Sequence, residues 1–201
     1  MSNRGTEPRV VVALRAKEEA LPKLSDDSVA CACATGDPAA VAELFLRFRE
    51  PVTRYLSRLV GARADVEDLL QITFLQIAKG GARYGGRASV RTWLFAIATN
   101  VVKHHRRSGA RFLRLLEAAR SEPERVAPSA PPTNDEQLLR QLEAALAALS
   151  SDQRFAFVLC EIEGFSAREA AAILETSEQA VWRRVCDARR GLRALLKEED
   201  P

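Results

Sequence analysis

Apolar positions in the last third of the chain recur with the spacing of two successive short helices. Ser166 and Glu169 have the S-x-x-E spacing of a capping box and predict the start of the first helix. Ser177 follows a polar break and is placed to cap the second helix. From there the apolar residues fall on one side of a helix, and they are Val181, Val185, Ala188, Leu192 and Leu195.

The remaining surface of this second helix is basic. Between residues 179 and 193 the polar positions outside the apolar stripe are Gln179, Arg183, Arg184, Arg189, Arg190 and Arg193, opposed only by Asp187. A short helix, a turn and a second helix with an apolar back and an arginine-rich face are typical of a helix-turn-helix that reads the major groove. An ordinary helical hairpin with a solvated basic face is the alternative for this segment taken alone.

The first half of the chain also has helical periodicity. Stretches that follow the i, i+3, i+4, i+7 template cover residues 41–48, 52–59, 66–77 and 90–101. Pro51 stands between the first two stretches and is expected to kink one continuous helix. Ser89 is placed to cap the last helix, and glycines within 80–86 indicate a mobile loop before it. No segment alternates as a strand does, so the pattern predicts an all-α fold.

A proline-rich segment, SEPERVAPSAPPTN at 121–134, divides the chain. Proline at this density prevents helix formation, so we expect two small helical domains joined by a flexible linker, the second domain containing the helix-turn-helix. The N-terminal extension is expected to be either flexible or a small regulatory helix. The predicted parts are the extension at 1–24, a first domain at 25–108, the linker at 109–135 and a second domain at 136–198.

Net charge and the lengths of the apolar runs limit the classes of protein to which the chain can belong. The 201 residues carry a formal net charge of only +3, so the basic charge is local and suggests a directed surface rather than a polycationic tail. No apolar run approaches the ~20 residues of a membrane span, and the run at 10–14 is too short for a signal peptide. We therefore expect a soluble, cytoplasmic protein.

The chemistry-bearing residues form no catalytic or metal-binding pattern. The four cysteines lack metal-ligand and redox spacing, and the adjacent His104 and His105 point about 100° apart on a helix. No nucleophile–base pair or phosphate-binding loop is evident. We therefore expect no metal, no cofactor and no enzymatic activity.

Four motifs occur in an order that is typical of one family. They are GDPAAVAELF at 36–45, DVEDLLQITFLQI at 65–77, SVRTWLFAIATN at 89–100 and LSSDQRFAFVLCEIEGFSAREAAAILETSEQAVWRRV at 149–185. With the linker, they resemble the bacterial RNA polymerase sigma factors, specifically the small two-domain extracytoplasmic-function (ECF) group. The resemblance implies a region 2-like domain at 25–108 and a region 4-like helix-turn-helix domain at 136–198.

The function that the resemblance implies is promoter-specific transcription initiation, by reading −35 duplex DNA and melted −10 DNA. The implied partners are core RNA polymerase, promoter DNA and an anti-sigma factor, without insertion into a membrane. The linker resembles the segment that threads the polymerase interior in this family, and a passive tether fits it equally well.

Candidate residues for the −35 duplex lie in and next to the second helix of the helix-turn-helix. Arg183 and Arg184 are expected to reach base edges, where arginine pairs with guanine. Trp182 is placed to contact a thymine methyl group or a sugar, and it is equally well placed to cover the domain surface without contacting DNA. The full set is Arg168, Gln179, Trp182, Arg183, Arg184 and Arg189, with Arg168 and Arg189 placed for the backbone.

Candidates for the melted −10 strand follow the glycine-rich loop. They are Arg87, Ser89, Arg91, Thr92, Asn100 and Lys103. Tyr84 fits stacking on a base or packing within the protein, and Trp93 falls on the inward stripe and is expected in the core.

For docking on polymerase, the polar face of the helix at 65–79 offers Glu67, Asp68 and Gln71. A plain solvated face with an acidic first turn is the alternative.

Two rival functions stay open. A stand-alone helix-turn-helix regulator would bind duplex DNA without polymerase and would not need the helix at 65–79. The other rival is a sigma-like adaptor or a decoy for an anti-sigma factor. Two departures from the family pattern suggest this second rival. Ile72 stands where the family usually has an acidic residue, and Asp187 stands where it usually has an arginine.

Overall fold

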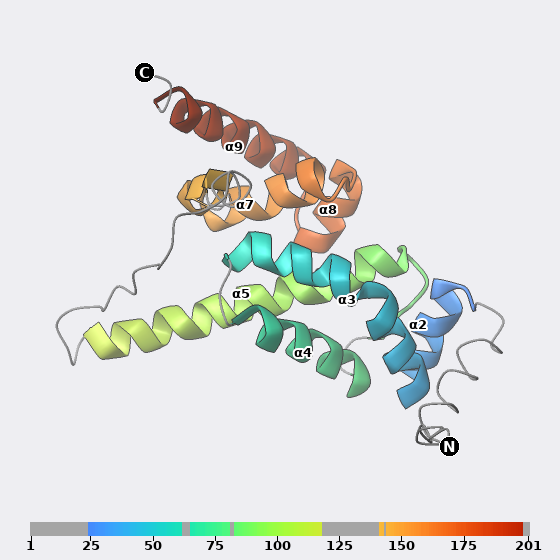
Figure 1. Cartoon of the computed structure of the whole chain (residues 1–201). Helices are drawn as coiled ribbons and strands as arrows, with labels where there is room; N and C mark the ends of the chain where they lie inside the picture. The colour runs from blue at the N-terminus through green and yellow to red at the C-terminus, as the bar shows by residue number, and fades with distance from the viewer. Residues whose placement is uncertain (1–23, 62–64, 81–82, 118–140, 143, 199–201) are drawn as a thin grey trace, which may run out of the picture.

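The computed structural model describes residues 24–61, 65–80, 83–117, 141–142 and 144–198, and all regular elements within them are helices (Figure 1). In chain order these are α2 (Asp26–Ala34), α3 (Pro38–Val60), α4 (Asp65–Ala78), α5 (Val90–Glu117), α7 (Ser151–Phe157), the π-helix η1 (Val158–Ile162), α8 (Ala167–Leu174) and α9 (Glu178–Glu198). The predicted all-α fold is confirmed for the described residues. The proline-rich segment at 121–134 and residues 1–23 lie outside them.

Helices α2 to α5 form a first helical unit. The side chain of Asp37 caps α3, which runs as one helix through Pro51 and so confirms the predicted continuity. Ser89 caps α5 as predicted, because its Oγ atom accepts a hydrogen bond from the Thr92 amide (3.1 Å). Local sequence signals therefore set the ends of these two long helices.

The centre of this unit is an aromatic contact between α3 and α5. Tyr55 and Phe95 are fully buried, and their ring centroids are 4.7 Å apart. The Thr99 hydroxyl donates to the Phe95 carbonyl (2.7 Å), so the Tyr55 hydroxyl donates to Thr99 Oγ1 (2.7 Å). Burial raises the pKa of Tyr55, which keeps this hydroxyl a neutral donor. The buried hydroxyls of Tyr55 and Thr99 thus find their hydrogen-bond partners within the core.

Helices α7, η1, α8 and α9 form a second unit, whose helix ends follow the predicted caps. Ser166 Oγ accepts from the Glu169 amide (3.2 Å), and the Glu169 carboxylate accepts from the Ser166 amide (2.9 Å), which confirms the capping box. Glu175 ends α8 in the left-handed region, with φ of 56°. Ser177 Oγ then accepts from the Ala180 amide (3.2 Å) at the start of α9. The predicted helix-turn-helix is confirmed.

One segment, residues 155–162, departs from the regular α-helical form. Its first half is α7, but its second half is the π-helix η1, in which the Glu163 amide donates to the Val158 carbonyl (2.9 Å). The wider turn adds one residue relative to an α-helix and so changes where the following side chains point. Gly164, with φ of 72°, then turns the chain toward α8.

The two units lie against each other in what we call the closed arrangement. α5 packs on α8, and α3 contacts η1 (Figure 1). The ring centroids of Phe95 and Phe165, one from each unit, are 5.0 Å apart. Arg106 of α5 and Arg154 of α7 both donate to the Leu59 carbonyl in the last turn of α3. Apolar and polar contacts therefore both join the units.

Removing the capping box of α8 is expected to cost stability in a pH-dependent way. Ser166→Ala should lower the free energy of unfolding by about 0.5–2 kcal/mol at neutral pH, because the Glu169 amide loses its acceptor and the Glu169 carboxylate loses the Ser166 hydroxyl. The hydrogen bond from the Ser166 hydroxyl lowers the pKa of Glu169, so the part of the cost due to this bond is present above the ordinary carboxyl pKa of 4.5 and is lost as the pH falls through the lowered pKa. Urea unfolding of the original protein and of the Ser166→Ala variant, at neutral and at acidic pH, measures the difference in their free energies of unfolding. An equal cost at both pH values would show that the hydrogen bond from the Ser166 hydroxyl to the Glu169 carboxylate contributes nothing to the cap.

Candidate nucleic-acid interface

Helix α9 exposes one side of its first turns. Gln179, Trp182 and Arg183 are all exposed there, Trp182 at 56%. Residues three and four positions apart lie on the same side of a helix, so these three side chains form one surface. The predicted apolar back of the helix is buried at Val181, Val185 and Ala188.

Arg184, a predicted base-reading residue, points elsewhere. It pairs with Asp152 of α7 (2.6 Å) and is only half-buried. Successive helical residues are 100° apart, so Arg184 lies about 140° around α9 from Gln179, on the flank toward α7. Of the two adjacent arginines, Arg183 is the one that shares a surface with Gln179.

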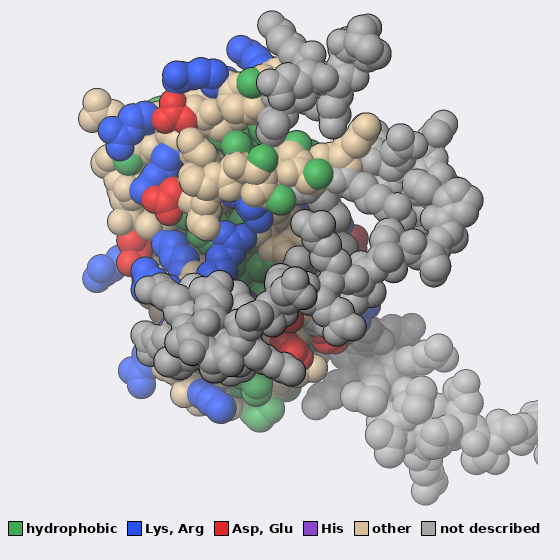
Figure 2. Space-filling model, turned by 90° about the vertical axis from the view of Figure 1, so that its left-hand side faces the viewer, with side chains coloured by type: hydrophobic (Ala, Val, Ile, Leu, Met, Phe, Trp, Pro, Cys, Tyr) green, Lys and Arg blue, Asp and Glu red, His purple; other side chains and the backbone are tan. Residues whose placement is uncertain are grey.

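The two arginines predicted to meet the DNA backbone are both accessible. Arg168 is exposed in the first turn of α8. Arg189 lies further along α9, where it forms two hydrogen bonds to Glu161 (2.8 and 2.9 Å) and remains 46% exposed. Figure 2 shows Lys and Arg side chains on the upper part of the molecule, where the second unit lies, with a few acidic side chains among them.

A pocket of about 420 Å³ lies where the loop at 83–88 meets α5. Ala172 and Ile173 of α8 form part of its wall, so both units contribute to it. The rings of Tyr84 and Trp93 meet edge to face in this wall, with centroids 5.3 Å apart. The first unit contributes to its lining Arg83, Tyr84, Gly85, Arg87, Ala88, Thr92, Trp93 and Ala96.

The Tyr84 side chain is packed within the protein. The sequence had left open whether this ring packs there or is free to stack on a base. It is 8% exposed, and its hydroxyl lies between the Asp27 carboxylate of α2 and the Ala88 carbonyl. The hydrogen bond to Asp27 raises the pKa of Tyr84 to about 12, so the hydroxyl stays protonated at neutral pH. Trp93 packs against the core, as predicted, and also lines the pocket.

The predicted −10 residues fall into two groups. Arg87, Ser89 and Asn100 are exposed, and Thr92 is buried with its hydroxyl bonded to that of Ser89 (2.8 Å). The second group is the two cations Arg91 and Lys103, whose partners lie in the second unit.

Arg91 and Lys103 face the second unit. Arg91 donates to the backbone carbonyl of Glu163 (2.6 Å), and Lys103 donates to the carbonyl of Leu174 at the end of α8 (3.3 Å). Both predicted DNA-binding cations are therefore engaged within the chain. Glu163 is not among the predicted site residues, because no local sequence pattern indicates a partner 72 residues away.

The predicted docking residues share the outer side of α4. Glu67, Asp68 and Gln71 are exposed there, and two large apolar side chains, Ile72 (42% exposed) and Leu75 (51% exposed), stand beside them. The opposite side of α4 is buried in the first unit at Leu69, Leu70, Phe74 and Ile77. The outer side of α4 is thus a mixed polar and apolar surface.

Two further observations concern the described residues alone. No three His, Cys, Asp or Glu side chains among them converge as a metal site would require. None of the helices in this part of the chain is long and apolar enough to cross a bilayer.

Comparison with known proteins gives two family matches. The chain matches Sigma-70 region 2 over residues 44–112 and Sigma-70 region 4 over residues 139–192. It is 35% identical over 165 residues to the RNA polymerase sigma factor CarQ of Myxococcus xanthus, covering 81% of this chain and 92% of CarQ. It is 31% identical over 180 residues to the ECF sigma factor SigC of Mycobacterium tuberculosis, covering 88% of this chain and 96% of SigC.

Two solved structures are similar in fold. CnrH, in complex with the cytosolic domain of CnrY, has a TM-score of 0.64 at 26% identity, covering 87% of this chain and 99% of CnrH. The sigma factor RpoE of Bartonella quintana, in complex with the anti-sigma factor NepR, has a TM-score of 0.64 at 27% identity, covering 80% of this chain and 98% of RpoE.

The chain belongs to the sigma-70 family of bacterial transcription initiation factors. Within that family it is an ECF sigma factor, which directs promoter-specific transcription initiation.

Proposed function

We propose that this ECF sigma factor works through three surfaces. The outer side of α4 docks on core RNA polymerase, the loop at 83–88 with the start of α5 binds the melted −10 strand, and the first turns of α9 read the −35 duplex. The observation that carries the proposal is the single exposed surface of Gln179, Trp182 and Arg183 on the second helix of the helix-turn-helix. In this role the protein is a specificity subunit in the cytoplasm, without catalytic activity of its own.

At the −35 duplex, side chains at the start of α9 reach the base edges. Arg183 can pair through two hydrogen bonds with guanine and Gln179 in the same way with adenine, while the exposed Trp182 ring can contact a thymine methyl group. Arg168 and Arg189 bind phosphates on either side and so hold the helix in the groove. Arg184 supports the position of α9 through its ion pair with Asp152.

At the −10 element, the loop at 83–88 and the first turns of α5 bind the melted strand. Arg87 meets phosphates from the exposed loop, and the first unit's side of the adjacent pocket, with Thr92 and the rings of Tyr84 and Trp93, has polar and aromatic groups that suit an unstacked base. Ser89, Thr92 and Asn100 supply hydroxyl and amide groups for base edges. Arg91 and Lys103 join them once the second unit moves away.

The outer side of α4 has the composition of a helix that packs on another helix. Ile72 and Leu75 supply apolar contact, and Asp68 and Gln71 beside them supply polar contacts that set orientation. Ile72 replaces the acidic residue usual in the family, so this protein's docking surface is more apolar at that point. Glu67 lies at the edge of the same surface.

An anti-sigma factor is a further proposed partner. RpoE of Bartonella quintana was solved with the anti-sigma factor NepR, and CnrH with the cytosolic domain of CnrY. Because both are similar to this chain over at least 80% of its length, we propose that it too is held inactive by a protein of that kind.

Base reading by α9 is tested by comparing two adjacent arginines. Arg183→Ala should weaken binding to the −35 element by about 1–3 kcal/mol and relax the preference at one base pair. Arg184→Ala, the matched control, should leave the preference unchanged, because its partner is Asp152. Competition binding across single-base variants of the element, identified by mapping transcription starts after induction, measures both effects. A uniform loss of affinity for every variant with Arg183→Ala would contradict base reading.

The stand-alone regulator is distinguished by co-purification. A tagged chain expressed in its own cells should retain core polymerase through a gel-filtration step. A chain that retains duplex DNA but no polymerase would instead behave as a stand-alone helix-turn-helix regulator.

A further inference from the structure

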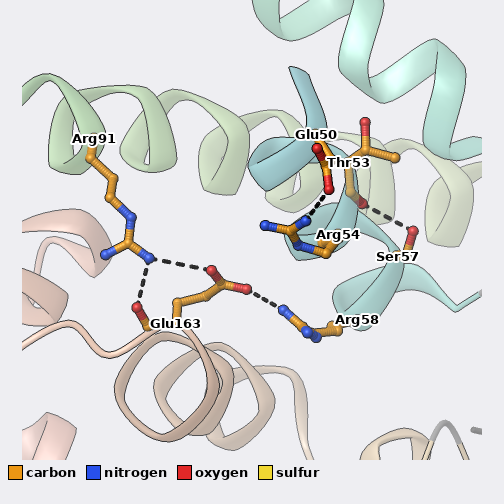
Figure 3. A network of polar contacts seen from close by, with 7 residues as sticks. All are labelled: Glu50, Thr53, Arg54, Ser57, Arg58, Arg91 and Glu163. Atoms are coloured by element: carbon orange, nitrogen blue, oxygen red, sulfur yellow. Dashed lines mark hydrogen bonds and ion pairs between the residues drawn. The ribbon is translucent and has the colours of Figure 1, made fainter. Parts of the chain in front are cut away.

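A buried carboxylate of the second unit bridges two arginines of the first. The Glu163 side chain is 9% exposed. One of its oxygens accepts a hydrogen bond from Arg58 of α3, and the other pairs with Arg91 of α5 (3.3 Å), which also donates to the Glu163 backbone carbonyl (2.6 Å) (Figure 3). Removing a carboxylate from water is costly unless it is paired in this way, so the contact depends on both arginines.

The backbone around Glu163 holds this carboxylate in position. The π-helical turn ends at the Glu163 amide, and the Phe165 amide donates to the Leu159 carbonyl (2.9 Å), which fixes the chain on both sides. The ring of Phe165 lies under the guanidinium of Arg91, with the Cζ atom 4.1 Å from the ring centroid. Arg91 is therefore held by an anion at its polar end and by an aromatic ring on its face.

We propose that Glu163 takes the place of a DNA phosphate on Arg58 and Arg91, so that the second unit shields the strand-binding side of the first until the chain opens. Carboxylates and phosphates are both bound by the planar donor fork of arginine, so the two anions compete for one site. Lys103 is occupied in the same way, by the Leu174 carbonyl. This inference rests on the proposed function of the first unit as the −10 binding domain.

The distance between the two promoter elements also requires opening. Sites about 25 base pairs apart are separated by about 85 Å at 3.4 Å per base pair. A compact chain of about 200 residues has a radius of gyration of about 16 Å, too small to reach both sites on straight DNA at once. The closed arrangement is therefore a state in which the protein does not bind a promoter, and the Glu163 contact stabilises it.

The test measures the distance between the units together with DNA binding. Cys31 of α2 and Cys186 of α9 are both exposed and can carry two fluorophores once Cys33 and Cys160 are replaced by alanine. In the labelled 201-residue chain, Glu163→Gln should shift the two labels toward longer distances. It should also bind a single-stranded DNA of about 15 nucleotides and mixed sequence at least about 5-fold more tightly, measured by anisotropy.

Two further variants keep the test decisive. Glu50→Gln removes an exposed partner of Arg54 within α3 and should change neither distance nor affinity. Arg58→Gln breaks the same contact from the first unit and should also lengthen the label distance, which covers the case in which Glu163→Gln does not fold.

Two results would overturn the proposal. One is a folded Glu163→Gln chain with the original distance and affinity. The other is an opened chain that binds the oligonucleotide no better than the original. In either case, transcription by the original chain with core polymerase would still test the proposed function separately.

Discussion

A Phe95→Ala chain is expected to lose about 3–5 kcal/mol of its free energy of unfolding, the cost typical of deleting a buried aromatic ring. Phe95 is fully buried, and its ring lies beside those of Tyr55 (4.7 Å) and Phe165 (5.0 Å). The guanidinium of Arg91 lies 5.1 Å from the same ring. The substitution therefore leaves a cavity in the first unit and removes one side of the contact between the units.

Urea unfolding followed by far-UV circular dichroism, which reports the loss of helix, measures this loss. Leu46→Ala is a suitable control, because the Leu46 side chain is 58% exposed on α3. Leucine and alanine are also both good helix formers, so the helix itself should not be weakened. The free energy of unfolding of that variant should lie within about 0.5 kcal/mol of the value for the original chain. A Phe95→Ala chain that is destabilised by less than about 1 kcal/mol would contradict the central position of this ring in the core.

Replacing Asp68 by arginine is expected to reduce binding to core RNA polymerase by at least about 10-fold, or about 1.4 kcal/mol. Asp68 is exposed beside Ile72 and Leu75 on the outer side of α4. Placing the opposite charge on this surface converts any complementary contact with polymerase into a repulsive one. Helical content should not change, since the opposite side of α4 forms the buried contacts.

Binding of purified core polymerase to the immobilised chain, with circular dichroism as the folding check, measures this effect. Glu50→Arg makes the same change of charge at a strongly exposed position of α3 and should bind polymerase as the original does. Equal binding by Asp68→Arg and Glu50→Arg would move the docking surface away from α4.

Local signals in the sequence predicted most of the fold. The caps at Ser89, Ser166 and Ser177 are side-chain-to-backbone contacts over three residues, so their spacing is visible in the sequence. The buried side of α9 follows from the helical period for the same reason. The orientation of Arg184 was also accessible from helical geometry, because its 140° separation from Gln179 needs only the residue numbers.

Contacts between distant segments were not predictable in this way. Glu163 meets Arg58 across 105 residues and Arg91 across 72, and a single sequence contains no signal that pairs them. The π-helical turn that aims Glu163 toward them has no distinct residue pattern, since its residues fit an α-helix equally well. The candidate −10 residues were therefore predicted by motif, while the contacts of two of them, Arg91 and Lys103, with the second unit required the structure.

Single-round transcription with purified core polymerase tests the central claim most directly. The template is DNA of the source genome, and the start sites are mapped with and without this protein. As a sigma factor, the chain should produce start sites absent with core polymerase alone, sharing one motif near −10 and another near −35. Arg183→Ala should weaken selection at one position of the upstream motif only. No new start sites from a folded chain that binds core polymerase would contradict the account and favour the adaptor or decoy.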